Sequence, residues 1–339
     1  MSGIRTDRSR SMGLSMKVIV LHGEVPEGAD QDEKDVLVQV DIVSRALAEQ
    51  GYEPMAVPVS LDFSSLIHHL SLLQPDFVFN LVESISGQGR LIHMAPSLLD
   101  YLKIPYTGAK AEAVFLTSNK LLAKQMLKQN GLATPAWISS GGTPAGNFLP
   151  GLYVIKSVWE HASVGLDENS ILQVQKESDL DEIMASRREA LGGSCFAETF
   201  IDGREFNLSL LAGPEGPEVL SPAEIRFDDF PPGKVRIVGY RAKWQEDSFE
   251  YHHTRRSFEF PENDLPLLQR LTELAVKCWQ LFSLKGYARV DFRVDPSGQP
   301  WILEVNTNPC LSPDGGFYAA AERASLTFNQ VIKRIMDDL

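Results

Sequence analysis

The sequence predicts an α/β protein that begins with a small parallel-sheet domain and ends in a region organised around a β-hairpin. Short apolar runs alternate with amphipathic helical patterns to about residue 109, and this strand–helix–strand order is typical of a parallel sheet. Nearer the C-terminus, two apolar-rich runs flank the turn signal Asp295-Pro296-Ser297-Gly298, which predicts a hairpin. A chain of 339 residues is long enough for about two or three domains.

The bulk composition argues against several classes of protein. The net charge of −13 argues against a nucleic-acid partner, because binding to phosphate backbones depends on a basic surface. No uninterrupted apolar run approaches the roughly 20 residues that span a bilayer. Cys195, Cys278 and Cys310 show neither disulfide nor zinc spacing, so a reducing cytoplasm is expected. Residues 1–16 lack the apolar stretch of a signal peptide and are expected to form a disordered leader.

The N-terminal domain is expected to span residues 17–109. Its first strand, residues 17–23, is an apolar run closed by glycine, which suits a buried parallel strand. Apolar residues at helical spacing follow, and Gly51 stands where a helix would end. The remaining expected elements are a weak strand at 57–59, a helix at 63–73, a strong strand at 76–82 and a helix at 94–102.

The first strand of the hairpin carries its polar residues on one face. Side chains alternate along a strand, so Arg289, Asp291 and Arg293 point to one side and the apolar residues between them to the other. An amphipathic helix is expected over residues 265–282, leading into this strand.

The second strand adds a carboxylate and an amide. We expect Glu304 and Asn306 to share a face with Ile302, and Asp291 to be a cross-strand or diagonal neighbour of Glu304. The opposite, buried face is expected to carry Trp301, Leu303 and Val305. Carboxylate and amide oxygens are ligands that Mg²⁺ prefers. The cluster is therefore either an ordinary polar sheet face or a site for magnesium, with Mn²⁺ as a second possible ion.

The hairpin resembles the end of an ATP-grasp domain, where R-x-D on one strand and E-x-N on the next hold the magnesium ions of MgATP. Phe79-Asn-Leu-Val-Glu83 and Ile104-Pro-Tyr-Thr-Gly108 are similar to motifs of D-alanine–D-alanine ligases and their homologues. The resemblance spans residues 17–339. It implies an α+β ATP-grasp fold, in which the N-terminal domain precedes two subdomains that sandwich ATP, a central one over 110–197 and a C-terminal one over 198–339.

The resemblance implies a phosphate site in the central subdomain. Lys120, which opens a helix with an expected N-cap at Ser118, matches a lysine that reaches the nucleotide phosphates, and Lys156 matches a second one. On spacing alone, Lys120 and Lys124 would form a solvated helix face. Ser163 lies in a run of small residues that matches the family's phosphate loop, where backbone N–H groups approach the nucleotide.

The stretch Cys195–Glu205 resembles the family's adenine and ribose site. Glu198 would accept a hydrogen bond from the adenine amino group, the backbone of Thr199 and Ile201 would contact the adenine edges, and Glu205 would hold the ribose hydroxyls. An acidic turn before a strand is the alternative. Residues 221–256 resemble a mobile loop that closes over the phosphates, with Lys243 as its γ-phosphate contact.

The amino-acid site matches the family less closely. Glu33 is the nearest match to a glutamate that contacts the ammonium group of the first amino acid. His252, His253, Arg255 and Arg256 are expected to be loop charge rather than ligands, with an arginine that meets an anionic substrate as the alternative. Arg289 and the backbone amide of Cys310 would stabilise an oxyanion. The remaining implied substrate contacts are Glu83, Gly315 and Gly316.

These residues imply an ATP-dependent ligase that joins two amino acids through an acyl-phosphate. D-alanyl-D-alanine synthesis is the nearest named activity, with ATP and Mg²⁺ as cofactors and amino acids as small-molecule partners. Ala162, Trp244 and residues 310–317 differ from the D-alanine pattern, so another amino acid or a peptide as acceptor is the rival reaction. A nucleotide-binding regulatory protein without ligation is the alternative from another class. Related ligases suggest a homodimer.

Overall fold

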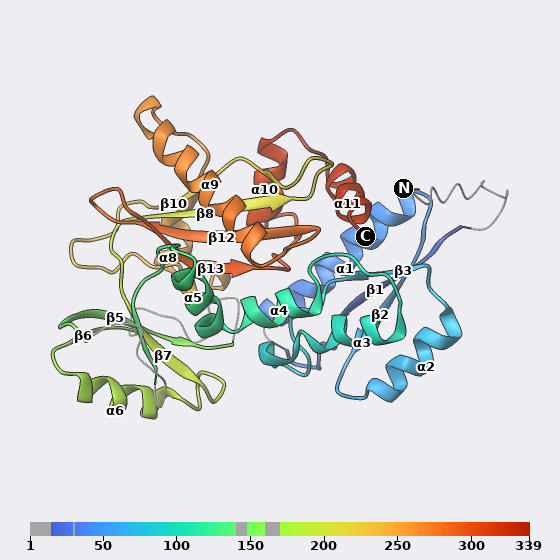
Figure 1. The fold of residues 1–339 in the computed structure, drawn as a ribbon, viewed down its shortest axis with the longest axis horizontal. Helices are drawn as coiled ribbons and strands as arrows, with labels where there is room; N and C mark the ends of the chain where they lie inside the picture. The colour runs from blue at the N-terminus through green and yellow to red at the C-terminus, as the bar shows by residue number, and fades with distance from the viewer. Residues whose placement is uncertain (1–14, 30, 140–147, 160–169) are drawn as a thin grey trace.

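The computed structural model describes residues 15–29, 31–139, 148–159 and 170–339. Most of the expected leader and the loop that contains Ser163 lie outside these residues. The described chain forms three sheets that follow one another along the sequence (Figure 1). None of the described helices is long and apolar enough to cross a bilayer.

The N-terminal sheet is parallel, as predicted, with the order β2-β1-β3. Helix α1 packs on one face of this sheet, while α2 and α3 pack on the other. Burial on both faces explains why β1 is an almost continuous apolar run. The elements are β1 (Lys17–Gly23), α1 (Gln31–Glu49), β2 (Glu53–Val59), α2 (Phe63–Leu73), β3 (Phe77–Asn80), η1 (Gly89–Leu91) and α3 (Met94–Leu102).

The central sheet is antiparallel, with the order β4-β7-β5-β6, and helix α6 covers one of its faces. Helices α4 and α5, which precede it in sequence, pack instead against the C-terminal sheet. The expected subdomain boundary at residue 197 falls inside β7. The elements are α4 (Ala111–Ser118), α5 (Lys120–Gln129), β4 (Trp137–Ser139), β5 (Gly151–Ser157), β6 (Ile171–Val174), α6 (Glu177–Arg187) and β7 (Cys195–Thr199).

The C-terminal sheet has the order β11-β10-β8-β12-β13, and β9 also pairs with β8. Helix α9 packs with α4 and α5 on one face of the sheet. The segment between β10 and β11 carries the short helices α7 and α8. The elements are β8 (Arg204–Leu211), β9 (Glu218–Val219), β10 (Ala223–Phe227), α7 (Tyr240–Trp244), α8 (Phe249–His253), β11 (Thr254–Ser257), η3 (Glu262–Asp264), α9 (Leu265–Leu281), β12 (Tyr287–Val294) and β13 (Pro300–Asn306).

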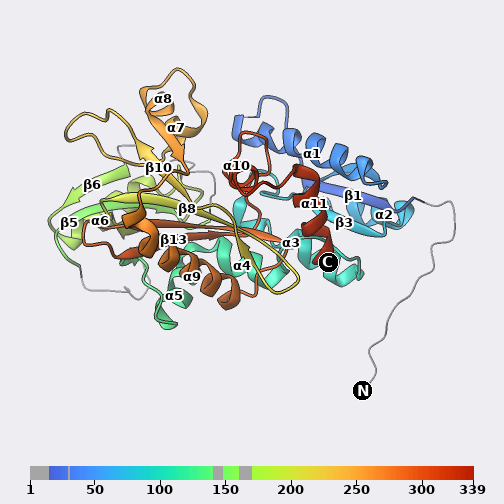
Figure 2. The ribbon, with the colours of Figure 1, turned by 90° about the horizontal axis from the view of Figure 1, so that it is seen from above.

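The last two helices return to the N-terminal domain. Helices α10 (Gly316–Arg323) and α11 (Phe328–Asp337) share a core with α1 and the N-terminal sheet, and Figure 2 shows them beside α1. The loop between β13 and α10 therefore runs from the C-terminal sheet to the N-terminal domain. Side chains of this loop are placed where all three parts of the molecule can contribute to one site.

A β-bulge changes the predicted faces of β13. Asp291 lies opposite Glu304, but the next pair joins Phe292 to Ile302, so Leu303 is an extra residue. Ile302 is fully buried in the core, whereas Leu303 lines a cavity together with Glu304. The prediction that Ile302 shares a face with Glu304, with Leu303 on the buried side, is therefore wrong, because strict alternation fails at the bulge.

The predicted N-cap of α5 is also wrong by one residue. Helix α4 includes Ser118, whose hydroxyl donates to the carbonyl of Val114. Asn119 forms the joint between the two helices, and its side-chain oxygen accepts hydrogen bonds from the backbone N–H groups of Leu121 and Leu122. Satisfying these two donors fixes the start of α5, and with it the position of Lys120.

Candidate active site

A cavity of about 500 Å³ receives side chains from all three parts of the molecule. Of the predicted site residues, Glu33 does not line this cavity, and Ser163 lies outside the described residues. The predicted site residues that line it are Glu83, Lys120, Lys156, Glu198, Thr199, Ile201, Glu205, Lys243, Arg289, Asp291, Glu304, Asn306, Cys310, Gly315 and Gly316. Residues far apart in the sequence thus meet around one space.

Glu198 is held by two lysines at the central sheet. The Nζ atoms of Lys124 and Lys156 each lie 2.5 Å from a different carboxylate oxygen of Glu198. Lys124 is only 1% exposed and also donates to the hydroxyl of Thr134. The prediction of a solvated face for Lys124 is therefore wrong, because the side of α5 that carries it packs against the two sheets.

The electrostatics of this cluster follow from burial and pairing. Burial lowers the pKa of Lys124 to about 8, although the charge of Glu198 opposes that shift. Burial alone would raise the pKa of Glu198, but Lys124 and Lys156 outweigh it and hold the pKa below its usual value. Glu198 is thus kept ionised in a nearly dry position. Lys124 lies four residues after Lys120, on the same face of the helix, and this spacing was the sequence signal that could have indicated its role.

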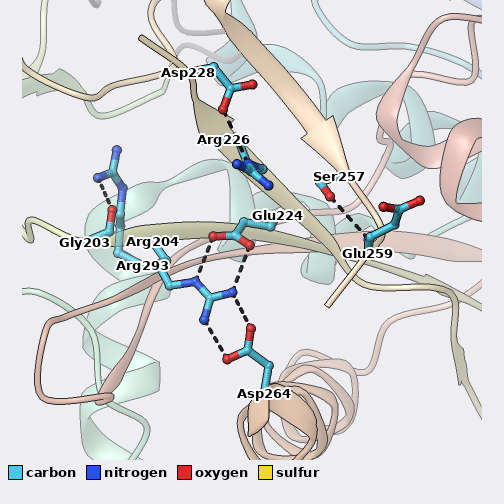
Figure 3. A network of polar contacts seen from close by, with 9 residues as sticks. All are labelled: Gly203, Arg204, Glu224, Arg226, Asp228, Ser257, Glu259, Asp264 and Arg293. Carbon is cyan, nitrogen blue, oxygen red and sulfur yellow. Dashed lines mark hydrogen bonds and ion pairs between the residues drawn. The ribbon is translucent and has the colours of Figure 1, made fainter. Parts of the chain in front are cut away.

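Glu205 and its neighbour Arg204 point to opposite faces of β8. Inside the cavity, Arg293 Nη2 lies 2.7 Å from Glu205 Oε2. On the other face, the guanidinium of Arg204 makes paired hydrogen bonds of 2.7–2.9 Å to Glu224 on β10 and to Asp264 before α9 (Figure 3). This second network ties β8 to its neighbours and thereby fixes the position of Glu205.

The chain turns sharply into β8 at Gly203. Its φ of +139° and its closeness to β12 both require glycine, because a Cβ atom there would lie 2.0 Å from the carbonyl oxygen of Val294. The carbonyl of Gly203 accepts a 3.4 Å hydrogen bond from Arg293 Nη1 (Figure 3). The turn thus helps to direct Arg293 towards Glu205.

Asp291, Glu304 and Asn306 form the predicted polar cluster. Asp291 accepts hydrogen bonds from Asn207 at 2.7 Å and from Arg289 at 2.7 and 2.8 Å. The amide nitrogen of Asn306 lies 3.2 Å from oxygens of both carboxylates. The described residues hold no group of three or more His, Cys, Asp or Glu side chains that could bind a metal. The donor set is two carboxylates and an amide, which suits a hard ion completed by water and phosphate.

The surroundings of this cluster shift the pKa values of its two carboxylates in opposite directions. Burial raises the pKa of Asp291, against the opposing charge of Arg289. Burial would also raise the pKa of Glu304, but nearby cations, led by Lys120 and Arg289, hold it well below its usual range. Glu304 is therefore the more readily ionised carboxylate of the pair.

Lys243 reaches the cavity from α7. Burial and the charge of Arg289 lower its pKa, while Glu304 acts in the opposite direction. The segment that carries it is anchored by Glu250, which lies 2.6 Å from Lys234 Nζ and 3.3 Å from Arg241 Nε. These contacts tie α8 to α7 and to the loop before it, within the segment that joins the antiparallel strands β10 and β11.

The opposite end of the cavity is acidic. Asp35 and Glu83 both line it. Asp35 accepts hydrogen bonds from the thiol of Cys310 at 3.0 Å and the hydroxyl of Ser312 at 2.7 Å. Gln39 donates to Glu83 at 2.8 Å and to Asp35 at 3.2 Å. The network joins α1 to the loop before α10.

Sequence reasoning missed Asp35 and Gln39, although their spacing of four residues on a predicted helix was a usable signal. Burial, together with Glu83 and Asp35, raises the pKa of Cys310 above its usual value. Its thiol is therefore protonated at neutral pH and acts as a hydrogen-bond donor. All three cysteines are free.

Comparisons with known proteins agree with this geometry. A family model described as "D-ala D-ala ligase C-terminus" matches residues 149–337. The D-alanine–D-alanine ligase of Aquifex aeolicus is 30% identical over 324 residues, which cover 95% of this chain and 100% of the relative. An uncharacterised protein of Sinorhizobium fredii is 28% identical, over 88% of this chain and 86% of that protein.

A solved structure has the same fold. The D-alanine–D-alanine ligase from Bacillus anthracis, determined in complex with ATP, matches with a TM-score of 0.72 and 20% identity, covering 96% of this chain and 97% of that one. Fold and family together define the class as ATP-dependent ligases with the ATP-grasp fold. Within that class, the chain belongs to the D-alanine–D-alanine ligase family.

Proposed function

We propose that this protein uses ATP to join two amino acids through an acyl-phosphate, with D-alanine as the nearest named substrate for both positions. One observation supports this most strongly: the candidate phosphate and metal residues share a cavity with the acidic pair Asp35 and Glu83. The Aquifex relative, matched over its full length, is named for D-alanine ligation. A site with only nucleotide contacts would not need the acidic end.

We propose that ATP lies between the central and C-terminal sheets. Glu198 would bind the adenine amino group, since each of its oxygens keeps a lone pair beyond its lysine contact. The backbone of Thr199 and Ile201 would contact the adenine edges, and Glu205 would bind the ribose. Lys120, Lys156 and Lys243 would contact the phosphates, together with Ser163.

Asp291, Glu304 and Asn306 would hold Mg²⁺ or Mn²⁺. When bound, the ion would offset the negative charge of the phosphates. The donor set fits this role once the Asn306 amide turns its oxygen towards the ion, and the two ends of an amide are exchanged by a simple flip. Arg289, which lies against Asp291, balances the two carboxylates before the ion enters.

The chemistry has two steps. A carboxylate oxygen of the first amino acid forms a bond to the γ-phosphorus, and the bond from that phosphorus to ADP breaks. The amine of the second amino acid then attacks the acyl carbon, and phosphate leaves from the tetrahedral intermediate as the amine loses a proton. Arg289 and the backbone N–H of Cys310 would stabilise the oxyanion. Asp35 and Glu83, rather than Glu33, are the groups that can accept the first ammonium.

Two alternatives are separated by one experiment. The second candidate function is a ligase with a different acceptor, which Trp244 and the hydrogen bond from Ser312 to Asp35 favour. The third is a nucleotide-binding protein without ligation. Phosphate release from ATP should be measured with single amino acids and then with pairs, including D-alanine. Release that requires a pair supports ligation and names the substrates. ATP binding without release for any pair would overturn the proposal.

The assembly is a separate proposal. We infer a homodimer, as for related ligases, and light scattering of the purified protein would give its mass. A monomer at the concentrations used for the activity screen would contradict it.

A further inference from the structure

Arg256 is a cavity-lining cation that the nucleotide site does not use. It lies on β11, opposite Ile225 of β10, and faces the same cavity as Arg289 and Gly316. Among the described residues it has no hydrogen bond and no ion pair. The residue as a whole is exposed, but partial desolvation of its guanidinium at the cavity and the positive charge of Arg289 lower its pKa, while Asp314 acts against that shift. A nearby anion would relieve this repulsion.

The neighbouring arginines of the cavity already have partners. Arg289 makes two hydrogen bonds to Asp291, and Arg293 is paired with Glu205. Lys156 at the nucleotide end is paired with Glu198. Arg256, in contrast, has no bonded partner among the described residues, so all of its donors are available to an anion near Arg289.

Gly316 gives Arg256 its position. A Cβ atom on Gly316 would lie 3.3 Å from Arg256 Nη2 and 3.5 Å from Nε, so the guanidinium rests against this glycine. Gly316 is the first residue of α10, and its neighbour Gly315 also lines the cavity. Backbone N–H groups at the start of a helix favour negative charge, so they add to the charge of Arg256 at the same place.

The hydroxyl in the adjoining loop does not compete for this role. Ser312 is 1% exposed, donates to Asp35 and does not line the cavity. The acidic side chains Asp35 and Glu83 line the same cavity. The amino-acid end of the cavity thus combines acidic groups with a cation, which suits zwitterionic substrates.

We propose that Arg256 binds the carboxylate of the acceptor amino acid, whose amine attacks the acyl-phosphate. This inference rests on the proposed function, because it needs a site for a second amino acid. It makes Arg256 a determinant of specificity: an acceptor must carry an anionic group on the side away from its reacting amine. A planar guanidinium can make two parallel hydrogen bonds to such a carboxylate.

Binding to the protein loaded with ADP and Mg²⁺ tests the inference without requiring turnover. The probes are alanine, serine and aspartate in both D- and L-forms, each compared with its α-carboxamide, in which the α-carboxylate is neutral. Calorimetry with wild type should show at least one acid bound more tightly than its amide, roughly 10- to 100-fold, as for hydrogen bonds to a charged group. Arg256→Gln should reduce this preference to less than about threefold, and Arg256→Lys should keep part of it.

Arg255→Gln is the matched control, because Arg255 precedes Arg256 on the same strand, is exposed like it and also lines the cavity, but does not lie against Gly316. It should keep the wild-type preference. Unchanged preference in Arg256→Gln, or no preference for any acid in wild type, overturns the inference. The activity screen is independent: with an active pair, Arg256→Gln should raise the KM of the acceptor while the KM of ATP stays within about twofold. If activity does not depend on Arg256, the proposed ligase function still holds, but the inference that Arg256 binds the acceptor is wrong.

Discussion

The two ends of the cavity are built in different ways. At the proposed nucleotide end, Glu198, Asp291 and Glu304 lie on strands, and their positions follow from strand pairing within two sheets, including the bulge beside Glu304. At the amino-acid end, Asp35 on α1 meets Cys310 in a loop 275 residues later. The first end depends on local geometry and the second on how distant segments pack.

Loss of the candidate metal ligand should have the largest effect. Glu304→Gln keeps the shape of the side chain but removes the charge, so kcat should fall about 100-fold or more, since a metal ion stabilises the transition state by several kcal/mol. Phosphate release at increasing Mg²⁺ and Mn²⁺ measures this. Glu259→Gln, an exposed carboxylate that follows β11 and does not line the cavity, is the control. A near-normal kcat in Glu304→Gln would show that Glu304 does not hold the metal ion.

Arg289→Met should lower kcat by about 10²–10³, because it removes a donor aimed at the developing oxyanion. The KM of ATP should change much less, since the three lysines remain. Thermal unfolding should be measured alongside, because Asp291 loses its buried partner. A fall in ATP affinity with unchanged kcat would show that Arg289 belongs to nucleotide binding instead.

The sequence predicted the nucleotide end better than the amino-acid end for a physical reason. Strand alternation and motif spacing were enough to bring Asp291, Glu198 and Lys156 to one cavity, while their roles there stay predictions. Alternation failed at Leu303, where an inserted residue reverses the faces of β13. Spacing alone also misassigned Lys124, because exposure depends on what packs against a helix.

The amino-acid end required information that local patterns do not contain. Glu33 and Asp35 are two residues apart, and only the packing of α1 against the loop after β13 decides which one faces the cavity. The return of α10 and α11 to the N-terminal domain sets that packing. The fold class and the order of strands and helices were predictable, whereas the contacts between domains were not.

Asp35→Asn should raise the KM of the first amino acid by about tenfold or more, because it removes the charge that faces an ammonium. Glu33→Gln, the matched change two residues away, should change that KM by less than about twofold. In both variants the KM of ATP should stay at the wild-type value. The reverse result, with Glu33 as the sensitive residue, would show that α1 sits differently against the cavity.

The smallest effect concerns stability and its dependence on pH. The folded pKa of Lys124 is about 8, below its ordinary 10.5. Between these values the unfolded chain keeps the proton that the folded state has lost, so the contribution of Lys124 to the free energy of unfolding rises with pH, by up to about 3 kcal/mol. Urea unfolding of wild type and Lys124→Met from pH 7.5 to 10.5 should show the difference moving in favour of wild type. A difference independent of pH would contradict the buried position of Lys124.

The central claim is that one cavity transfers the γ-phosphate to an amino-acid carboxylate. The most direct test is to supply the first amino acid with ¹⁸O in its carboxylate and analyse the released phosphate by mass spectrometry. Ligation through an acyl-phosphate predicts one ¹⁸O atom from the amino acid in each phosphate formed. Phosphate without ¹⁸O, whose one new oxygen comes from water, would show simple ATP hydrolysis and would contradict the account.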